Sequence, residues 1–181
     1  MSGVLVTGFE PFGGSDVNTS QLVAEALGGV VLPVSYARAA DTLRGAVRAA
    51  DPDVVICFGQ ADREVISVER FALNLDGSES EDNDGVVSSA EIDPNGPVAY
   101  RSTLPVDEIV AALRAEDIPA EASRSAGGFL CNRVFYVLMG LLEDRPGTTG
   151  GFVHVPEDMP IGLLVRAGEL VVACSAAPAL S

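Results

Sequence analysis

The stretch "DVVICFGQ", residues 53–60, places five apolar residues in a row, from Val54 to Phe58. Both alternating faces of such a strand are apolar, which is typical of a strand in the middle of a parallel sheet that helices cover on both sides. The dipeptide Asp51-Pro52 directly before it ends the preceding helix and turns the chain. The stretch therefore predicts the central strand of an α/β protein.

Apolar runs and amphipathic stretches alternate on both sides of this strand, as in a mostly parallel sheet with helices on both faces. We expect further strands at residues 4–9, 29–36, 64–75, 120–128 and 150–156. We expect helices at residues 18–29, 41–52, 105–119, 131–144 and 161–177. The chain of 181 residues shows no repeat and no linker, so residues 1–181 are expected to form a single domain.

Residues 76–89, "DGSESEDNDGVVSS", differ from the rest of the chain in composition. They are polar and acidic, and they are predicted to form a surface loop with no capacity to pack. Whether this loop closes over a site is left open by the sequence.

The composition excludes several classes of partner. Acidic residues number 26 against 11 basic ones, the formal net charge is −15, and no basic run occurs. Nucleic acid and anionic membrane surfaces are therefore not expected as partners. The N-terminus lacks the features of a signal peptide and no apolar stretch reaches membrane-spanning length, so a cytoplasmic location is expected.

Cys131 is the cysteine with the strongest chemical context. The chain has three cysteines without CxxC spacing, which indicates neither a disulfide framework nor a zinc site. Cys131 follows Gly-Gly in "SAGGFLCNRVFY", at the expected start of a helix. Free N–H groups there lower a thiol pKa and can bind an oxyanion. Cys57, in the buried strand, and Cys174, in the last helix, are interpreted as structural.

His154 is the only histidine, so any imidazole chemistry must use it. It lies near the end of a strand, where open α/β sheets bind their ligands. One helix and a return turn separate it from Cys131, so both residues can lie at the same sheet edge. An imidazole beside a thiol can take the thiol proton and return it to a leaving amine.

Glu69 is an acidic residue within the otherwise apolar stretch "ISVERFALNL". A carboxylate there is costly unless it has a partner. That partner is either an arginine, such as the neighbouring Arg70, or His154, which Glu69 would then orient. The sequence leaves both assignments open.

The stretch "VTGFEPFGG", residues 6–14, runs from a strand into a glycine-bordered loop. Its spacing matches neither the dinucleotide-binding nor the Walker pattern, no lysine is present, and Glu10 would repel a phosphate. A phosphate-binding role is therefore not expected, and it stays open at this point whether the loop, which carries Phe9 and Phe12, holds an apolar ring instead.

Five ordered motifs together resemble the pyroglutamyl-peptidase I (pyrrolidone-carboxylate peptidase) family of cysteine peptidases. They are "VTGFEPFGG" with Asn18 and Ser20, "CFGQA", "VERFALNL" followed by "DNDG", "SAGGFLCNRVFY", and "GGFVHVP", from Val6 to Pro156. The resemblance implies an enzyme that removes an N-terminal pyroglutamyl residue from peptides. It implies a three-layer α/β/α sandwich with an open, twisted, mixed and mostly parallel sheet. It further implies no metal and no organic cofactor, and an assembly into a homotetramer or dimer.

The same resemblance assigns roles to individual residues. By motif match, the catalytic residues are the nucleophile Cys131, its base His154, and Glu69, which orients His154. The substrate-binding residues comprise aromatic holders of the lactam ring, a backbone contact and two residues beside the nucleophile: Phe9, Phe12, Gln60, Phe129 and Leu130.

Three features depart from the family pattern. Glu79, Ser80 and Glu81 stand where an Arg-Ile-Pro-like stretch is common, which removes an arginine associated with the active site and an apolar wall of the pocket. Arg133 stands where histidine is frequent, and the chain after Pro156 is short, which affects surfaces used for assembly. Two alternatives therefore remain: a lactam-binding homologue without turnover, and a related cysteine amidase with another N-terminal specificity.

Overall fold

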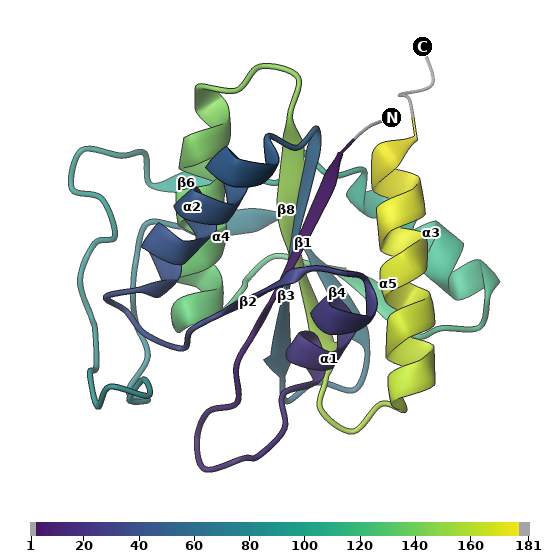
Figure 1. Ribbon diagram of the computed structural model, residues 1–181, viewed down its shortest axis with the longest axis horizontal. Coiled ribbons are helices and arrows are strands. Elements are labelled where there is room, and N and C mark those ends of the chain that lie inside the picture. Colours follow the sequence, from purple (N-terminus) through teal and green to yellow (C-terminus); the bar gives the residue numbers. More distant parts are fainter. Residues whose placement is uncertain (1–2, 178–181) are drawn as a thin grey trace.

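The computed structural model describes residues 3–177, and Figure 1 shows a central sheet between two layers of helices. The six strands of this sheet are, in spatial order, β2 (Val30–Leu32), β1 (Val4–Phe9), β3 (Val54–Ala61), β8 (Thr149–Pro156), β4 (Ile66–Glu69) and β7 (Ala120–Ser123). The first four run parallel, whereas β4 is antiparallel to β8 and parallel to β7. The expected mixed, mostly parallel α/β/α sandwich is confirmed.

Each face of the sheet carries its own helices and its own apolar core. Helices α2 (Ala39–Ala50) and α4 (Leu130–Glu143) pack on one face, and α1 (Thr19–Ala26), α3 (Val106–Ala115) and α5 (Ile161–Ala176) pack on the other (Figure 1). Strand β3 serves both cores, since Cys57 lies in the first and Phe58 in the second. This double burial is the reason for its unbroken apolar sequence.

The predicted strand region 64–75 divides at Arg70. Its first part is β4, and its second part, β5 (Phe71–Leu73), leaves the main sheet and pairs with β6 (Ala99–Arg101) in a separate two-stranded sheet. The sequence did not predict β6. The pairing joins segments far apart in the chain, which local alternation does not reveal.

The predicted strand 29–36 is shorter in the structure, where β2 spans only Val30–Leu32. Pro33 lacks the N–H that would continue the ladder. The carbonyl of Ser35 then accepts the N–H groups of Arg38 and Ala39, at 3.2 and 2.9 Å, so the chain turns toward α2.

The acidic loop 76–89 is anchored, which corrects the prediction that it cannot pack. Asp76 is fully buried, and so is most of Asp82. The Asp82 carboxylate accepts the N–H groups of Tyr36, Asp84 and Val86 at 2.7, 2.9 and 2.8 Å. A carboxylate can be buried when backbone donors satisfy it in this way, and composition alone does not show this.

The connection between β3 and β4 is important for the site. The two strands flank β8 in the sheet, and β4 runs antiparallel to β8, with Ser67 opposite His154. Residues 62–65 therefore cross the carboxyl end of β8 before the chain returns as β4.

Among residues 3–177, no helix combines the length and apolar character needed to cross a bilayer.

Candidate active site

Cys131 lies in the first turn of α4, as the sequence predicts. The helix begins at Leu130, and Phe129 before it is extended, with φ −99° and ψ −167°. The N–H groups of Asn132 and Arg133 donate to the carbonyl of Phe129, at 3.1 and 3.3 Å. Within residues 3–177, the N–H groups of Leu130 and Cys131 donate to no backbone carbonyl. They are therefore available to an anion at the helix start.

The glycines before Cys131 have separate structural reasons. Gly127 has φ +78°, a left-handed conformation that favours glycine. Gly128 faces the backbone of Gly77, where a Cβ would stand 2.8 Å from the Gly77 carbonyl carbon. The carbonyl of Gly128 accepts the Gly77 N–H at 2.8 Å, so the start of the acidic loop contacts the turn that leads to Cys131.

Gly59 brings the thiol next to the histidine. A Cβ atom on Gly59 would stand 2.7 Å from the Cys131 sulfur, so the sulfur lies directly over this glycine of β3. His154 is the partner of Gly59 in the β3–β8 register. Cys131 and His154 also line the same cavity. The predicted juxtaposition of helix start and strand end is therefore present.

Glu69 is the partner of His154. Its Oε1 atom lies 2.7 Å from His154 Nδ1, and both side chains are buried. With Nδ1 facing a carboxylate, the Nδ1–H tautomer is favoured, which leaves Nε2 as the proton acceptor. The arginine alternative is realised as well, by Arg63 rather than Arg70: Arg63 Nη1 lies 2.9 Å from the same Oε1 atom. Arg70 pairs with Asp107.

The environment keeps both Cys131 and His154 neutral. The pKa of the Cys131 thiol is raised to about 12, mainly by burial and next by the charge of Glu69, with Arg63 acting in the opposite direction. The expectation that the helix start lowers this pKa is wrong for the free protein, because the loss of hydration outweighs the helix N–H groups. Burial lowers the pKa of His154 below its usual 6.5, although Glu69 acts in the opposite direction. At neutral pH the pair is a thiol and an uncharged imidazole.

A cavity of about 280 Å³ lies in front of Cys131 and His154. The predicted ring-binding and pocket residues all line it: Phe9, Phe12, Gln60, Phe129 and Leu130. The rings of Phe12 and Phe129 pack with centroids 5.9 Å apart, and Tyr36 packs edge-on against Phe129 at 5.8 Å. The cavity thus offers aromatic walls to a small uncharged ring.

Phe9 and Phe12 differ in their surroundings. Phe9 ends β1, is buried, and packs against Phe152 at 6.5 Å, whereas Phe12 is only partly buried. Phe152 in turn lies 4.9 Å from the His154 ring. Phe9 therefore supports the histidine as well as the cavity, and Phe12 serves mainly as a wall.

The Gln60 side chain points to α1 rather than into the cavity. Its Oε1 atom accepts the N–H and hydroxyl of Thr19, at 2.7 and 3.2 Å. At the same corner, the Asn18 side chain caps α1 and Ser20 Oγ accepts the N–H of Phe9 at 3.0 Å. The Oε1 atom of Gln60 is thereby occupied by α1, and a backbone contact from Gln60 to the lactam stays a prediction.

A sequence profile described as pyroglutamyl peptidase matches residues 2–165. The chain belongs to the pyroglutamyl peptidase family. Within this family it is 47% identical over 168 residues to the pyrrolidone-carboxylate peptidase of Clavibacter michiganensis, covering 86% of this chain and 79% of that one. It is 43% identical over 178 residues to that of Streptomyces coelicolor, covering 90% and 82%.

Solved pyroglutamyl peptidase structures share the whole fold. The pyrrolidone carboxyl peptidase of Thermococcus litoralis superposes with a TM-score of 0.93 at 35% identity, over 97% of this chain and 93% of that one. Pyroglutamyl peptidase I of Bacillus amyloliquefaciens gives 0.94 at 33% identity, over 98% and 97%. The sequence resemblance to this family of cysteine peptidases is thereby confirmed.

The two residues directly after Cys131 fix α4 to the segment around the start of the acidic loop, and the sequence did not predict this positioning role. Asn132 is fully buried, and its side chain bonds the N–H and carbonyl of Leu73 and the carbonyl of Leu75, each at 2.9 Å. Arg133, where the family often has histidine, forms a two-pronged ion pair with the buried Asp76. Polar residues inside an apolar helix were the available signal for both.

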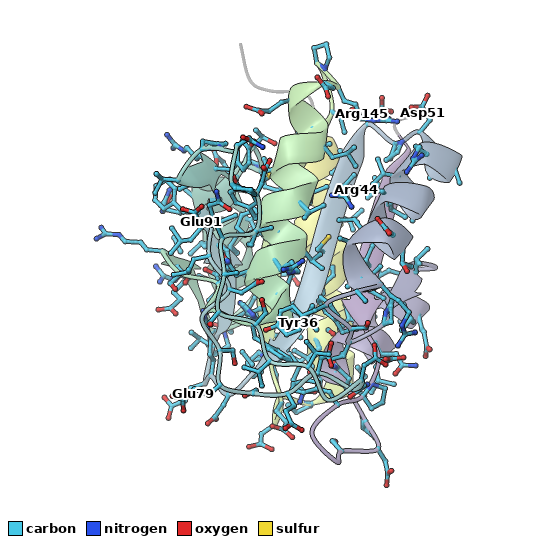
Figure 2. The ribbon with its side chains drawn as sticks, turned by 90° about the vertical axis from the view of Figure 1, so that its left-hand side faces the viewer. Tyr36, Arg44, Asp51, Glu79, Glu91 and Arg145 are labelled. Carbon is cyan, nitrogen blue, oxygen red and sulfur yellow. The ribbon has the colours of Figure 1, made fainter. Side chains whose placement is uncertain are left out.

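The residues that replace the family's Arg-Ile-Pro-like stretch lie outside the cavity. Gly77 and Ser78 line it, but Glu79, Ser80 and Glu81 are exposed. Figure 2 shows Glu79 at the outer side of the loop, away from Tyr36. The start of loop 76–89 therefore forms part of the cavity wall, and Glu79 and Glu81 are exposed outside it.

Proposed function

We propose that this chain is a cysteine exopeptidase that hydrolyses the amide bond after an N-terminal pyroglutamyl residue of a peptide. The observation that carries the proposal is the position of the Cys131 sulfur over Gly59, next to a histidine that Glu69 holds at 2.7 Å. Membership of the pyroglutamyl peptidase family supports the same substrate.

In the proposed reaction, His154 acts on a neutral thiol. Nε2 takes the Cys131 proton as the sulfur attacks the pyroglutamyl carbonyl, and the N–H groups at the start of α4 bind the resulting oxyanion. His154 then gives the proton to the departing peptide amine, and a thioester remains. Water, activated by the same imidazole, attacks the thioester, releases pyroglutamate and restores the thiol. Glu69 stabilises the imidazolium that forms at each proton transfer.

Recognition of the lactam relies on packing and backbone groups. The ring is small and uncharged, so the walls formed by Phe12 and Phe129, with the backbone at Gln60, supply the contacts. A pyroglutamyl residue has no free α-amine, and among the described residues that line the cavity, which are mainly aromatic and apolar, none is an aspartate or a glutamate.

The test uses a fluorogenic pyroglutamyl amide, with glutamyl and prolyl amides as comparisons, under reducing conditions. We expect hydrolysis of the pyroglutamyl amide alone, severe loss in Cys131→Ala and His154→Ala, and a smaller loss in Glu69→Gln. Cys174→Ala, which changes a cysteine on α5, is the matched control and should keep full activity. An inert wild type, or an active Cys131→Ala, would contradict the proposal.

Lactam binding without turnover is the second candidate, and it is motivated by Glu79, which stands where the family commonly has an arginine associated with the active site. Calorimetric binding of pyroglutamate together with an inert wild-type protein would establish this function instead. Hydrolysis of other blocked peptides but not pyroglutamyl ones would indicate a related amidase.

We further propose that residues 1–181 act as one domain, in the cytoplasm, as a homotetramer or dimer. The free thiols at Cys57, Cys131 and Cys174 support a reducing compartment. Exposed apolar side chains at Phe71, Leu73 and Leu75 support self-association. Light scattering on the eluting protein gives the assembly, and a monomer at all concentrations would contradict it.

A further inference from the structure

Glu69 is buried, and only one of its two carboxylate oxygens has polar partners among the described residues. Its side chain is fully buried, and Oε1 lies 2.7 Å from His154 Nδ1 and 2.9 Å from Arg63 Nη1. Among the described residues, Oε2 has no hydrogen-bond partner. Arg63 is therefore the group that compensates this charge, and any change at position 63 is transmitted through Glu69 to His154.

Arg63 is itself held in place from the nucleophile's side. Its Nη2 donates to the carbonyl of Ser125 at 2.9 Å, and its Nη1 lies 3.3 Å from Ser123 Oγ. Ser123 ends β7, and Ser125 lies in the segment that leads into α4 and Cys131. One planar guanidinium thus links β4 with the entry to α4, and it does so from residues 62–65, which cross the end of β8. Lysine lacks the fork needed to reach all three acceptors.

We propose that Arg63 is a positioning residue of the reaction: it fixes Glu69 and His154 relative to Cys131 and limits the effect of the Glu69 charge on both. This inference rests on the proposed function and extends it to a residue that lines the same cavity but whose guanidinium is bonded to Glu69, Ser123 and Ser125.

The charges around the pair give Arg63 a definite electrical role. Glu69 raises the pKa of Cys131 and of His154, and Arg63 lowers both. The other ionisable group acting on the Cys131 thiol is the buried Cys57. Without Arg63, the carboxylate would hold a proton on His154 more strongly and oppose the thiolate of Cys131. At the pH of the reaction, a larger fraction of His154 would then already be protonated and unable to accept the proton of the Cys131 thiol.

Arg70 provides a matched control. It neighbours Glu69 in sequence and carries the same charge, but its guanidinium pairs with Asp107. Arg70→Met therefore changes the net charge of the protein as Arg63→Met does, without removing a partner of Glu69.

The experiment compares wild type with Arg63→Met, Arg63→Lys and Arg70→Met in two assays. The first is the pH dependence of kcat and KM on the pyroglutamyl amide, and the second is the rate of Cys131 alkylation by iodoacetamide, read by peptide mass spectrometry. For Arg63→Met we expect kcat to fall about 10- to 100-fold, part of the roughly 10²- to 10⁴-fold contribution of general acid–base catalysis. KM should change less than kcat, because the Arg63 guanidinium, although at the cavity wall, is already bonded to Glu69, Ser123 and Ser125.

The pH readouts separate positioning from a structural role. In Arg63→Met the acid limb of kcat/KM should move to higher pH and alkylation at pH 8 should slow, whereas Arg70→Met should match wild type. In Arg63→Lys the acid limb of kcat/KM should return close to its wild-type pH because the positive charge is kept. Its kcat should stay further below wild type, because lysine cannot reach all three acceptors. An Arg63→Met protein with wild-type kcat, acid limb and alkylation rate would overturn the inference, and so would a lower kcat with both pH readouts unchanged.

Two further arms keep the test decisive. If Arg63→Met does not fold, the double variant Arg63→Met/Glu69→Gln removes the unpaired charge, and its alkylation rate should be close to that of wild type. The inference would then be overturned if the double variant were alkylated at the same rate as Glu69→Gln alone and a folded Arg63→Lys at the same rate as wild type. If wild type hydrolyses no pyroglutamyl amide, the proposed function fails, and the alkylation rates alone support or overturn the role of Arg63.

Discussion

The sulfur of Cys131 and the α-carbon of Gly59 are packed so closely that a Cβ at position 59 would stand 2.7 Å from the sulfur. The same atom would stand 2.7 Å from the ring of Phe152. Because Phe152 also packs against His154, a single added methyl group displaces both members of the proposed pair.

Gly59→Ala should therefore lose kcat/KM by about 100-fold or more, since misplacing a reacting group by about 1 Å can cost that much. Gly45→Ala is the matched control, because a Cβ on Gly45 meets no atom within 4 Å and α2 continues through it. That control should keep full activity and gain about 0.4–1 kcal/mol of stability. Steady-state kinetics with thermal melting checks both, and an active Gly59→Ala would refute the close approach.

Alkylation of wild-type Cys131 should be slow at neutral pH. The pKa of the thiol is raised to about 12 by burial, so the reactive thiolate fraction should rise about tenfold per pH unit up to pH 10. Iodoacetamide rates at several pH values measure this directly. A rate that levels off below pH 8 would instead show that the helix start lowers the pKa, as first expected.

Glu69→Gln should shift the acid limb of kcat/KM to lower pH. His154 must be uncharged to accept the thiol proton, so activity falls as pH falls through its pKa, which already lies below 6.5. Glu69 raises that pKa, and its removal lowers it further. Activity should also fall about 10- to 100-fold in kcat, within the range of general acid–base contributions. A shift to higher pH would contradict this account of the pair.

Phe12→Ala and Phe9→Ala should distinguish a ring that binds the substrate from a ring that stabilises the fold. Phe12→Ala should raise KM about tenfold, the equivalent of about 1.4 kcal/mol, with little change in Tm. Phe9→Ala removes a buried ring and should cost about 3–5 kcal/mol of stability. In Phe12→Ala the alkylation rate of Cys131 should stay close to that of wild type. An unchanged KM in Phe12→Ala would remove Phe12 from the lactam site.

Arg133→Met should destabilise the protein by about 3 kcal/mol, since it leaves the buried Asp76 charge unpaired. For a chain of this length that corresponds to a Tm lower by roughly 6–12 °C. Arg38→Met breaks an ion pair with Asp84 that is largely exposed, and should lower Tm much less than Arg133→Met does. Thermal melts of the two variants side by side test the difference, and equal Tm values would contradict it.

The sequence predicted the candidate catalytic residues, because each could be recognised from its residue type and its position in a helix or strand. Cys131 at a helix start and His154 near a strand end were predicted to share a sheet edge, because adjacent βα units place these ends together. Glu69 was predicted to need a partner, because a charge inside an apolar strand is costly. These inferences required only local pattern and the rules of α/β topology.

The sequence could not predict what depends on contacts between distant segments. Arg63 reaches Glu69 because residues 62–65 cross β8, and nothing in the local pattern shows that crossing. The raised pKa of Cys131 depends on the depth of burial, which packing sets. The unequal surroundings of Phe9 and Phe12 likewise appear only once Phe152 is placed beside β1.

Hydrogen bonds fix the acidic loop on both sides of residues 79–81, and this determines which of its positions tolerate substitution. Gly77 is bonded to Gly128 on one side of the triplet 79–81, and Asp82 binds three N–H groups on the other. A triplet bracketed in this way can change sequence over generations without moving the wall beside Cys131. Substitutions at residues 79–81 can therefore change the surface charge beside the cavity while the cavity wall and the residues around Cys131 keep their positions.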